Sequence, residues 1–301
     1  MRPPGRLTLR PHAKINLGLR VLGTRSDGYH EIRTRFQTID LADELEIEAS
    51  SNDVELAVEG EALAADRTNL VWRAAELIRS RRSGLPGARL RLKKSIPIAA
   101  GLGGGSSDAA ATLLALNRLW GFPLERHELV ELAIRLGADV PFFLHGGLAL
   151  GTGKGDDLEP LPDRDPFPVC LILPPYGSPT EEVYRLWDRR RPAAIETVGA
   201  EAAVVSEDTR SVHNDLQETV FSLHPELGAI HELLYRAGAF AASLSGSGSS
   251  LYGLFRSPEE IRALRESRDW GAFKVLTCRT VSRPEYCRAL GAQDPFEPGS
   301  S

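Results

Sequence analysis

The feature of this sequence that most constrains its fold is a glycine-rich segment that runs directly into an alanine-rich helical pattern. Its residues are Pro97, Ile98, Ala99, Ala100, Gly101, Leu102, Gly103, Gly104, Gly105, Ser106 and Ser107. Leu113, Leu116 and Trp120 then fall on one face of the expected helix, and Gly121 ends it. Glycines at a helix start leave backbone N–H groups unobstructed, where the positive end of the helix dipole also lies. The segment therefore predicts a cradle for an anion, most simply a phosphate group.

Two common nucleotide-binding motifs do not fit this segment. A Walker loop ends in Gly-Lys-Ser/Thr, whereas Gly105 is followed here by two serines. A dinucleotide-binding fold needs Gly-x-Gly-x-x-Gly, but the position three residues after Gly103 is Ser106. A flexible linker is the remaining alternative, and a linker would not pass within two residues into a capped apolar helix. Alone, the segment indicates a phosphate-bearing ligand and nothing finer.

Composition limits the class of protein. The chain has 301 residues, 42% of them hydrophobic, and a net charge of −5, which is typical of a soluble globular protein of two domains. A mildly acidic chain is a poor candidate for binding nucleic acid, and no apolar run approaches the ~20 residues of a membrane span. We therefore expect a cytoplasmic protein that binds neither nucleic acid nor membrane. Cys170, Cys278 and Cys287 are widely spaced, which predicts reduced thiols and no metal site of their own.

The first half of the chain predicts a mixture of strands and helices. Strands are expected at 7–9, 15–21, 33–40, 44–49, 54–58, 90–93 and 148–150, and helices at 70–78 and 129–136. Lys14 and Asn16 share the polar face of one strand, which by itself is expected to meet water. Asp139 lies two residues before a proline and is expected to be the N-cap of a short helix. Such a carboxylate is normally ionised, as a general base must be.

The segment 159–168 contains four prolines and predicts a domain boundary. Beyond it, strands are expected at 169–173, 241–250, 251–255 and 273–280, and helices at 180–187, 227–237 and 261–264. Small-residue turns occur at 151–157, where we expect only a turn, and at 245–249. The segment 192–208 is expected to be a surface excursion. The resulting domains are 1–162 and 163–291, followed by a disordered tail at 292–301.

Six segments together resemble the motifs of a known family. They are Ala-Lys-Ile-Asn-Leu at 13–17, Asp-Gly-Tyr-His at 27–30, the glycine-rich segment at 101–110, Gly-Ala-Asp-Val-Pro-Phe-Phe at 137–143, Gly-Thr-Gly-Lys-Gly at 151–155 and His-Asn-Asp-Leu at 213–216. In these motifs the chain resembles the GHMP kinases, the superfamily of galactokinase, homoserine kinase and mevalonate kinase. The segments at 27–30 and 137–141 resemble the branch that phosphorylates a cytidine diphosphate ester of methylerythritol in the non-mevalonate isoprenoid pathway.

The resemblance implies an α+β fold of two domains. The N-terminal domain would be similar to ribosomal protein S5 and the C-terminal domain to ferredoxin, with ATP and a small-molecule substrate meeting in the cleft between them. Mg²⁺ bridging the β- and γ-phosphates is expected, although no carboxylate cluster in the sequence marks its site. A monomer or weak homodimer is expected.

The resemblance also assigns roles to residues. Asp139 would be the general base for the substrate hydroxyl, and Lys14 would hold and polarise the base and the hydroxyl. Lys94 with residues 97–107 would bind ATP. These roles agree with the chemistry, because phosphoryl transfer needs in-line positioning, neutralisation of charge and a group that accepts the hydroxyl proton.

Substrate recognition would fall mainly on aromatic residues. Tyr29 and Tyr184 would sandwich the cytosine, and His30 would form a hydrogen bond to it. Residues expected to hold the remainder of the substrate are Asn16, Thr180, Gly246, Ser247 and Gly248.

Three alternatives remain at this point. A kinase for another small alcohol, such as homoserine or mevalonate, would share the glycine-rich segment, but the Asp-Gly-Tyr-His segment argues against it. A catalytically silent nucleotide sensor would be expected to lack the base, whereas both Asp139 and Lys14 are present. A nucleic-acid-binding role, suggested only by the S5-like fold, lacks the basic face that phosphate backbones require.

Overall fold

The computed structural model describes residues 5–50, 53–60, 63–190 and 212–292. Within these ranges it contains three four-stranded sheets and eight α-helices, so the fold is α+β as predicted. The expected excursion at 192–208 and all but the first residue of the expected tail lie outside the described residues.

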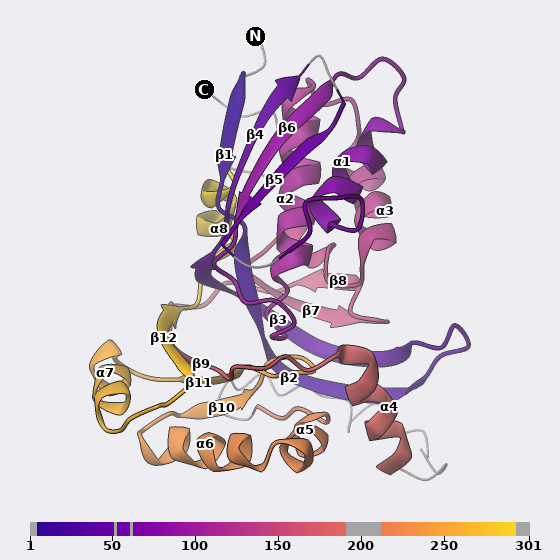
Figure 1. The fold of residues 1–301 in the computed structure, drawn as a ribbon. Coiled ribbons are helices and arrows are strands. Elements are labelled where there is room, and N and C mark those ends of the chain that lie inside the picture. The colour runs from indigo at the N-terminus through magenta and orange to yellow at the C-terminus, as the bar shows by residue number, and fades with distance from the viewer. Residues whose placement is uncertain (1–4, 51–52, 61–62, 191–211, 293–301) are drawn as a thin grey trace.

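The first sheet and three helices form one half of the molecule (Figure 1). Its strands, in spatial order, are β1 (Arg6–Leu9), β4 (Glu44–Ser50), β6 (Gly87–Lys93) and β5 (Glu55–Glu59). The helices packed on it are α1 (Leu70–Arg79), α2 (Gly104–Leu119) and α3 (Arg126–Leu136). Along β6, Leu90 and Leu92 are buried while Arg89 and Arg91 are exposed, which is the alternation of a sheet with one covered face.

The second sheet lies between the two halves and contains the longest strands. Its order is β2 (His12–Thr24), β3 (His30–Ala42), β7 (Leu148–Thr152) and β8 (Asp157–Pro160), all antiparallel. The β2–β3 hairpin projects beyond the rest of this sheet in Figure 1. Its tip therefore carries the Asp-Gly-Tyr-His segment away from the core.

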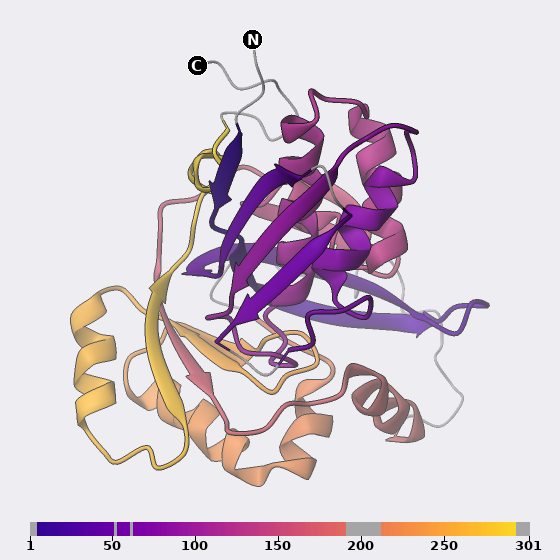
Figure 2. The same ribbon diagram turned by 45° about the horizontal axis from the view of Figure 1, so that its top comes forward.

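The third sheet has the order β10 (Ala241–Leu244), β11 (Leu251–Leu254), β9 (Pro168–Leu173) and β12 (Lys274–Arg279). Its accompanying helices are α4 (Thr180–Arg190), α5 (Gln217–Leu223), α6 (Pro225–Arg236) and α7 (Pro258–Glu266). Figure 2 shows this orange and yellow layer beneath the purple half. Read across the sheet from β12, the strands are the fourth, first, third and second of this sheet in chain order. Helices lie in both crossover connections. This is the predicted ferredoxin-like arrangement.

Apolar side chains join the second and third sheets. Along β9, Cys170 and Ile172 face the core beneath α6 and α7, whereas Leu171 faces a second cluster that contains Ile15 of β2. Ala100 and Leu102 of the glycine-rich segment belong to this second cluster too. The segment is therefore built into the core between the two halves.

The last helix, α8 (Arg283–Ala289), packs back on the N-terminal half. Its Tyr286 hydroxyl donates a 2.7 Å hydrogen bond to the carbonyl of Phe143, and the amide of Arg10 donates to the carbonyl of Ala289 at 3.0 Å. The domain limits 1–162 and 163–291 stay predictions. Helix α8 follows the C-terminal half in the chain but packs against the N-terminal half.

Candidate active site

A cavity of about 930 Å³ opens where the start of α2, the β2–β3 hairpin and α4 converge. It brings together nearly all the site residues expected from the sequence. Those on its wall are Lys14, Asn16, Tyr29, His30, Lys94, residues 97–106, Asp139, Thr180, Tyr184, Gly246 and Ser247. Ser107 and Gly248 are not part of this lining. Ser107 is fully buried in the first turns of α2, and Gly248 is buried against the side chain of Leu244.

Residues 97–103, the glycine loop, adopt conformations that require glycine at two positions. Gly103 has a φ of 69°, and a Cβ atom there would lie 2.8 Å from the Phe143 ring. Gly101 has a φ of 75°, and its Cβ would lie 2.1 Å from the carbonyl oxygen of Ser245. Gly103 is also the N-cap of α2 and provides no capping side chain. The first N–H groups of α2 therefore remain available to an anion in the cavity.

Four hydrogen bonds hold the glycine loop from outside. The amide of Lys14 donates to the carbonyl of Leu102 at 3.0 Å. The Ser245 hydroxyl donates to the carbonyl of Gly101 at 2.9 Å. The remaining two link Ser250 N to Ala100 O and Ser178 N to Ala99 O, both at 3.3 Å. Three of the four come from the C-terminal half, so the loop conformation depends on both halves.

Lys14 and Asp139 meet beneath the loop. The Lys14 Nζ atom is 3.4 Å from Asp139 Oδ2, and the Asp139 side chain keeps 34% of its surface exposed to the cavity. The expectation that Asp139 caps a helix was wrong. The short 3₁₀ turn that follows begins at Phe142, has Pro141 as its N-cap and has no side-chain cap. Because the turn starts three residues later, the carboxylate is left to pair with Lys14.

The expected water-facing side of the first long strand is buried. Lys14 is 3% exposed and Asn16 is 2% exposed, because the glycine loop and the turn at Gly246 cover that face of β2. Lys14 Nζ donates a 2.6 Å hydrogen bond to Asn16 Oδ1, and Asn16 Nδ2 donates to the Thr34 hydroxyl at 2.8 Å. The ammonium is therefore held in one position by a polar chain that runs into β3.

The ammonium of Lys94 faces two carboxylates. Its Nζ atom donates to Asp43 and, at 2.8 Å, to Asp108 Oδ2, and all three side chains are almost wholly buried. Burial opposes the charge of Lys94, but the two carboxylates outweigh it and raise the pKa of the ammonium. That Lys94 binds ATP stays a prediction. Asp43 is not among the site residues expected from the sequence, where it is only a polar residue between two expected strands.

Two rings stack at the opposite end of the cavity, and a third lines the cavity at the hairpin tip. The rings of His30 and Tyr184 stack with centroids 4.5 Å apart, and His30 Nε2 lies 2.8 Å from Asp188 Oδ1. Burial raises the pKa of the Tyr184 phenol, and the charge of Asp139 adds to the shift. Tyr29, by contrast, is 57% exposed at the hairpin tip.

Thr180 and the second small-residue turn lie between the two ends. The Thr180 and Ser247 hydroxyls are 2.8 Å apart, which links the start of α4 to the turn. Asn214, in the His-Asn-Asp-Leu segment, donates from Nδ2 to the carbonyls of Leu244 and Gly246 at 3.0 and 2.7 Å. This segment therefore fixes the turn from behind.

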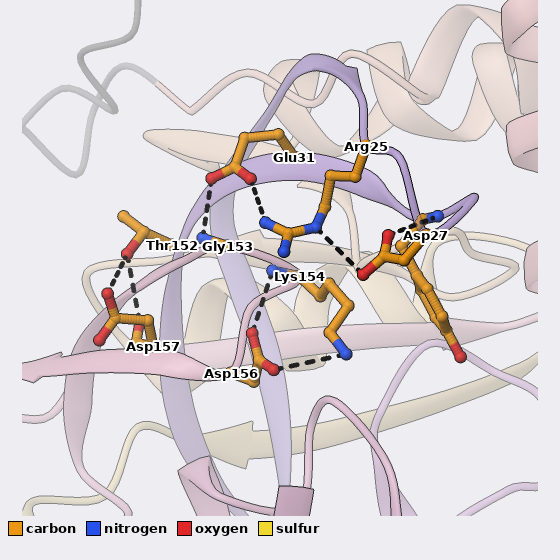
Figure 3. Close-up of polar contacts among 9 residues, drawn as sticks. Arg25, Asp27, Glu31, Thr152, Gly153, Lys154, Asp156 and Asp157 are labelled. Carbon is orange, nitrogen blue, oxygen red and sulfur yellow. Dashed lines mark hydrogen bonds and ion pairs between the residues drawn. The ribbon is translucent and has the colours of Figure 1, made fainter.

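The turn between β7 and β8 does more than reverse the chain. Lys154 lines the cavity, and its Nζ atom lies 4.7 Å from the centroid of the Tyr29 ring. Figure 3 shows how the turn is tied to the hairpin: Glu31 accepts from Gly153 N at 3.1 Å and from Arg25 at 2.5 Å. From its local sequence this segment is expected to be only a turn, although residues 151–155 form one of the six segments that resemble the family. Two signals favour a role for Lys154: that motif and the scarcity of lysine, with five in the chain.

Within the described residues, no group of three or more His, Cys, Asp or Glu side chains could hold a metal ion by itself. Among the helices in the placed part of the chain, none is long and apolar enough to cross a membrane.

The chain is similar to proteins of one kinase superfamily. The family models for the GHMP kinases N terminal domain and the GHMP kinases C terminal match residues 69–147 and 199–268. A 4-diphosphocytidyl-2-C-methyl-D-erythritol kinase of Pelotomaculum thermopropionicum is 43% identical over 282 residues, which cover 92% of this chain and 98% of that protein. One of Solibacter usitatus is 46% identical over 294 residues, which cover 94% and 90%.

Solved structures agree with these relatives. A crystal structure of 4-(cytidine 5'-diphospho)-2C-methyl-D-erythritol kinase has a TM-score of 0.74 and 38% identity, and the match covers 90% of this chain and 99% of that chain. A homoserine kinase from Cytophaga hutchinsonii has a TM-score of 0.73 at 19% identity, over 94% and 96%. The latter likeness shows the fold alone.

Proposed function

The chain belongs to the 4-diphosphocytidyl-2-C-methyl-D-erythritol kinases of the GHMP superfamily, and from this membership we propose its reaction. It transfers the γ-phosphoryl group of ATP to the 2-hydroxyl group of 4-diphosphocytidyl-2-C-methyl-D-erythritol, a step of the non-mevalonate isoprenoid pathway. The observation that carries the proposal is one cavity that joins three parts. A helix N-terminus with free N–H groups lies at one end, a cluster of aromatic rings at the other, and the Lys14–Asp139 pair between them.

Asp139 accepts the proton of the substrate hydroxyl, and Lys14 orients it. A loose phosphoryl-transfer transition state needs the acceptor oxygen in line with the γ-phosphorus and a base within hydrogen-bond reach. The carboxylate of Asp139 is the exposed partner of the pair, so it can meet the hydroxyl. Lys14 is fixed by Asn16 and lies 3.4 Å from Asp139, so its ammonium can compensate negative charge on both the carboxylate and the transferring group.

The glycine loop and the start of α2 bind the phosphates of ATP. Backbone N–H groups at a helix N-terminus suit the β- and γ-phosphates, and the absence of side chains at Gly103 and Gly104 permits close approach. Lys94 and the apolar side chains of Leu63, Leu70 and Ile98 line the adjoining part of the cavity, where the adenosine would lie.

The residues present fit a magnesium ion bound mainly by ATP. Mg²⁺ in kinase sites takes one or two protein oxygens, and its other ligands are phosphate oxygens and water. The Asp139 carboxylate and the Ser106 hydroxyl are oxygen donors on the wall of the cavity near the loop. When bound, the ion would neutralise charge on the β- and γ-phosphates.

Tyr29, His30 and Tyr184 bind the cytosine, and Asn16, Thr180 and the turn at Gly246 hold the remainder of the substrate. An aromatic ring exposed at a hairpin tip and a partly buried ring beside His30 provide faces for stacking a base. The enzyme is further proposed to act in the cytoplasm as a monomer or weak homodimer, and the net charge of −5 disfavours nucleic acid as a partner.

The test is ATP turnover with a panel of alcohols. We expect ADP release with 4-diphosphocytidyl-2-C-methyl-D-erythritol and only background release with homoserine, with mevalonate or without acceptor. Turnover with homoserine or mevalonate that matches or exceeds turnover with the cytidyl substrate would replace the proposal. ATP binding without turnover of any acceptor would favour the silent nucleotide sensor.

A further inference from the structure

A buried charged cluster connects the two ends of the glycine loop. Asp43 lies between β3 and β4, Lys94 follows β6, and Asp108 lies in the second turn of α2. The Lys94 ammonium donates to both carboxylates, and each of the two carboxylate residues is 1% exposed. The cluster therefore joins three elements that are distant in sequence.

Asp43 also holds the backbone where the loop begins. Its Oδ1 atom accepts hydrogen bonds from the amides of Ser95 and Ile96 at 2.5 and 2.8 Å, directly before Pro97. Its own amide donates to the carbonyl of Pro11 at 2.9 Å, so the carboxylate is fixed by the main chain. The Lys94 ammonium also donates to Asp108 in α2. The backbone before the loop and the helix after it are therefore both linked to Lys94, the former through Asp43.

We propose that Asp43, Lys94 and Asp108 form a positioning triad that sets the glycine loop in the conformation that binds nucleotide phosphates. Asp43 and Asp108 do not belong to the cavity lining, so they act through the loop and not by touching the nucleotide. Lys94 in this role is a link between carboxylates and not a phosphate ligand. The inference deepens the proposed function, because it concerns how the same site receives ATP.

The charge balance of the cluster explains how one ammonium can serve two carboxylates. Burial raises the pKa of the Asp108 carboxyl to about 8; Lys94 opposes the shift and Asp43 adds to it. Of the two carboxyls, Asp108 is the one whose protonated form burial favours. Buried ion pairs add little stability compared with well-packed apolar residues, whereas removing one partner leaves an uncompensated charge. A role in positioning accounts for the cluster better than a role in stability.

The first experiment titrates a non-hydrolysable ATP analogue and CDP separately into Asp43→Ala and wild type by calorimetry. Hydrogen bonds to charged groups contribute about 1.5 to 3 kcal/mol, so we expect analogue affinity to fall at least about tenfold. The affinity for CDP, which probes the ring cluster, should change by less than about twofold. Leu227→Ala, in the core beneath α6, is the matched control for lowered stability without contact with the loop. Analogue affinity within twofold of wild type in folded Asp43→Ala would overturn the proposal.

Conservative variants keep the test decisive if Asp43→Ala does not fold. Asp108→Asn keeps an oxygen for Lys94 and resembles the protonated acid, so its loss of analogue affinity should be smaller than that of Asp108→Leu. Equal losses in these two variants, or none in either, would contradict the positioning role of Asp108. Amide hydrogen exchange at Ser95 and Ile96 should accelerate in folded Asp43→Ala and accelerate less in Asp43→Asn, which keeps an acceptor oxygen. Unchanged exchange in Asp43→Ala would contradict the tether.

A double variant separates positioning by Lys94 from direct phosphate binding. Lys94→Met should weaken binding of the analogue, and Lys94→Met with Asp43→Asn should recover part of the loss, because the second change removes the buried charge left without a partner and keeps an oxygen for the amides of Ser95 and Ile96. A phosphate ligand would show no such recovery. These titrations need no acceptor substrate, so an error in the proposed reaction would leave their outcome readable.

Discussion

The two ends of the cavity are built by different means. At the glycine loop, the cavity wall includes backbone N–H groups, and hydrogen bonds from Lys14, Ser245 and Ser250 hold the loop. At the hairpin tip, the wall consists of exposed or partly exposed side chains, with Tyr29 57% exposed and Lys154 beside it. One end is fixed from many directions and the other depends on a few surface contacts.

The two constructions should tolerate substitution to different degrees. A backbone cradle loses its geometry when any supporting atom is displaced, because packed interiors do not deform continuously. A side-chain platform loses the contribution of the ring that is removed, and the remaining contacts persist. We therefore expect substitutions at the loop to act on ATP, substitutions at the tip to act on the cytidyl substrate, and losses to be larger at the loop.

Asp139, between the two ends, provides the largest expected effect. Asp139→Asn is nearly isosteric, so ATP and substrate affinities should stay close to wild type, whereas kcat should fall by about 10²- to 10⁴-fold, the contribution of a positioned general base. Steady-state kinetics together with calorimetry of both ligands measure this split. Turnover within a few fold of wild type would leave Asp139 only as a partner of Lys14.

Gly103→Val tests the loop end. The left-handed φ at this position and the 2.8 Å approach to the Phe143 ring each add strain of about 1 to 3 kcal/mol. A displaced loop that loses about 2.7 kcal/mol of binding free energy lowers ATP affinity by about 100-fold. The affinity for CDP should change little. Calorimetric titration measures both.

Gly121→Val is the matched control for Gly103→Val. Gly121 has a similar φ of 80° at the end of α2, with no atom within 4 Å of its Cβ position. It carries the same backbone strain away from the cavity, so its unfolding midpoint should fall while its ATP affinity stays near that of wild type. Equal loss of ATP affinity in both variants would mean that general destabilisation, and not loop geometry, governs binding.

The contrast between the two ends also explains what could be predicted from sequence. The glycine loop was predictable because the φ angles and close approaches at Gly101 and Gly103 exclude other residues, so composition itself records the geometry. The strand and helix patterns were confirmed for most elements for the same reason, since one buried face imposes a period. The missed elements β8, α5 and α8 are four to seven residues long, too short for a period to emerge.

The polar network of the site was not predictable from local patterns. Lys14 and Asn16 occupy what resembles a water-facing strand, and they are buried only because the loop and the Gly246 turn fold over them. Lys94 pairs with Asp43, which lies 51 residues away in the chain, and with Asp108, which lies 14 residues away. Their roles depend on tertiary contacts that no single segment encodes, and motif resemblance alone brought Lys14 forward.

Tyr29→Ala tests the tip. The loss of a base stack is worth about 1 to 3 kcal/mol, so the affinity for the cytidyl substrate should fall by about 5- to 150-fold while ATP affinity stays unchanged. CDP should compete with the substrate in wild type and lose that ability in the variant. Tyr29→Phe is the control, because the ring face and not the hydroxyl would make the contact. Equal losses for ATP and substrate, or none for either, would remove the cytosine assignment and restore homoserine or mevalonate as candidate substrates.

Lys154→Met should give the smallest effect of these substitutions. An exposed cation–π contact contributes about 0.5 to 1 kcal/mol, so losing the ammonium beside Tyr29 should weaken the cytidyl substrate by about two- to fivefold and leave ATP unaffected. Lys274→Met, on the exposed side of β12, is the matched control for the loss of one positive charge. A loss above tenfold that shrinks as salt is added would mean that the ammonium binds an anionic group of the substrate directly. No loss would mean that Glu31, through its bonds to Arg25 and Gly153, holds the hairpin tip without help from Lys154.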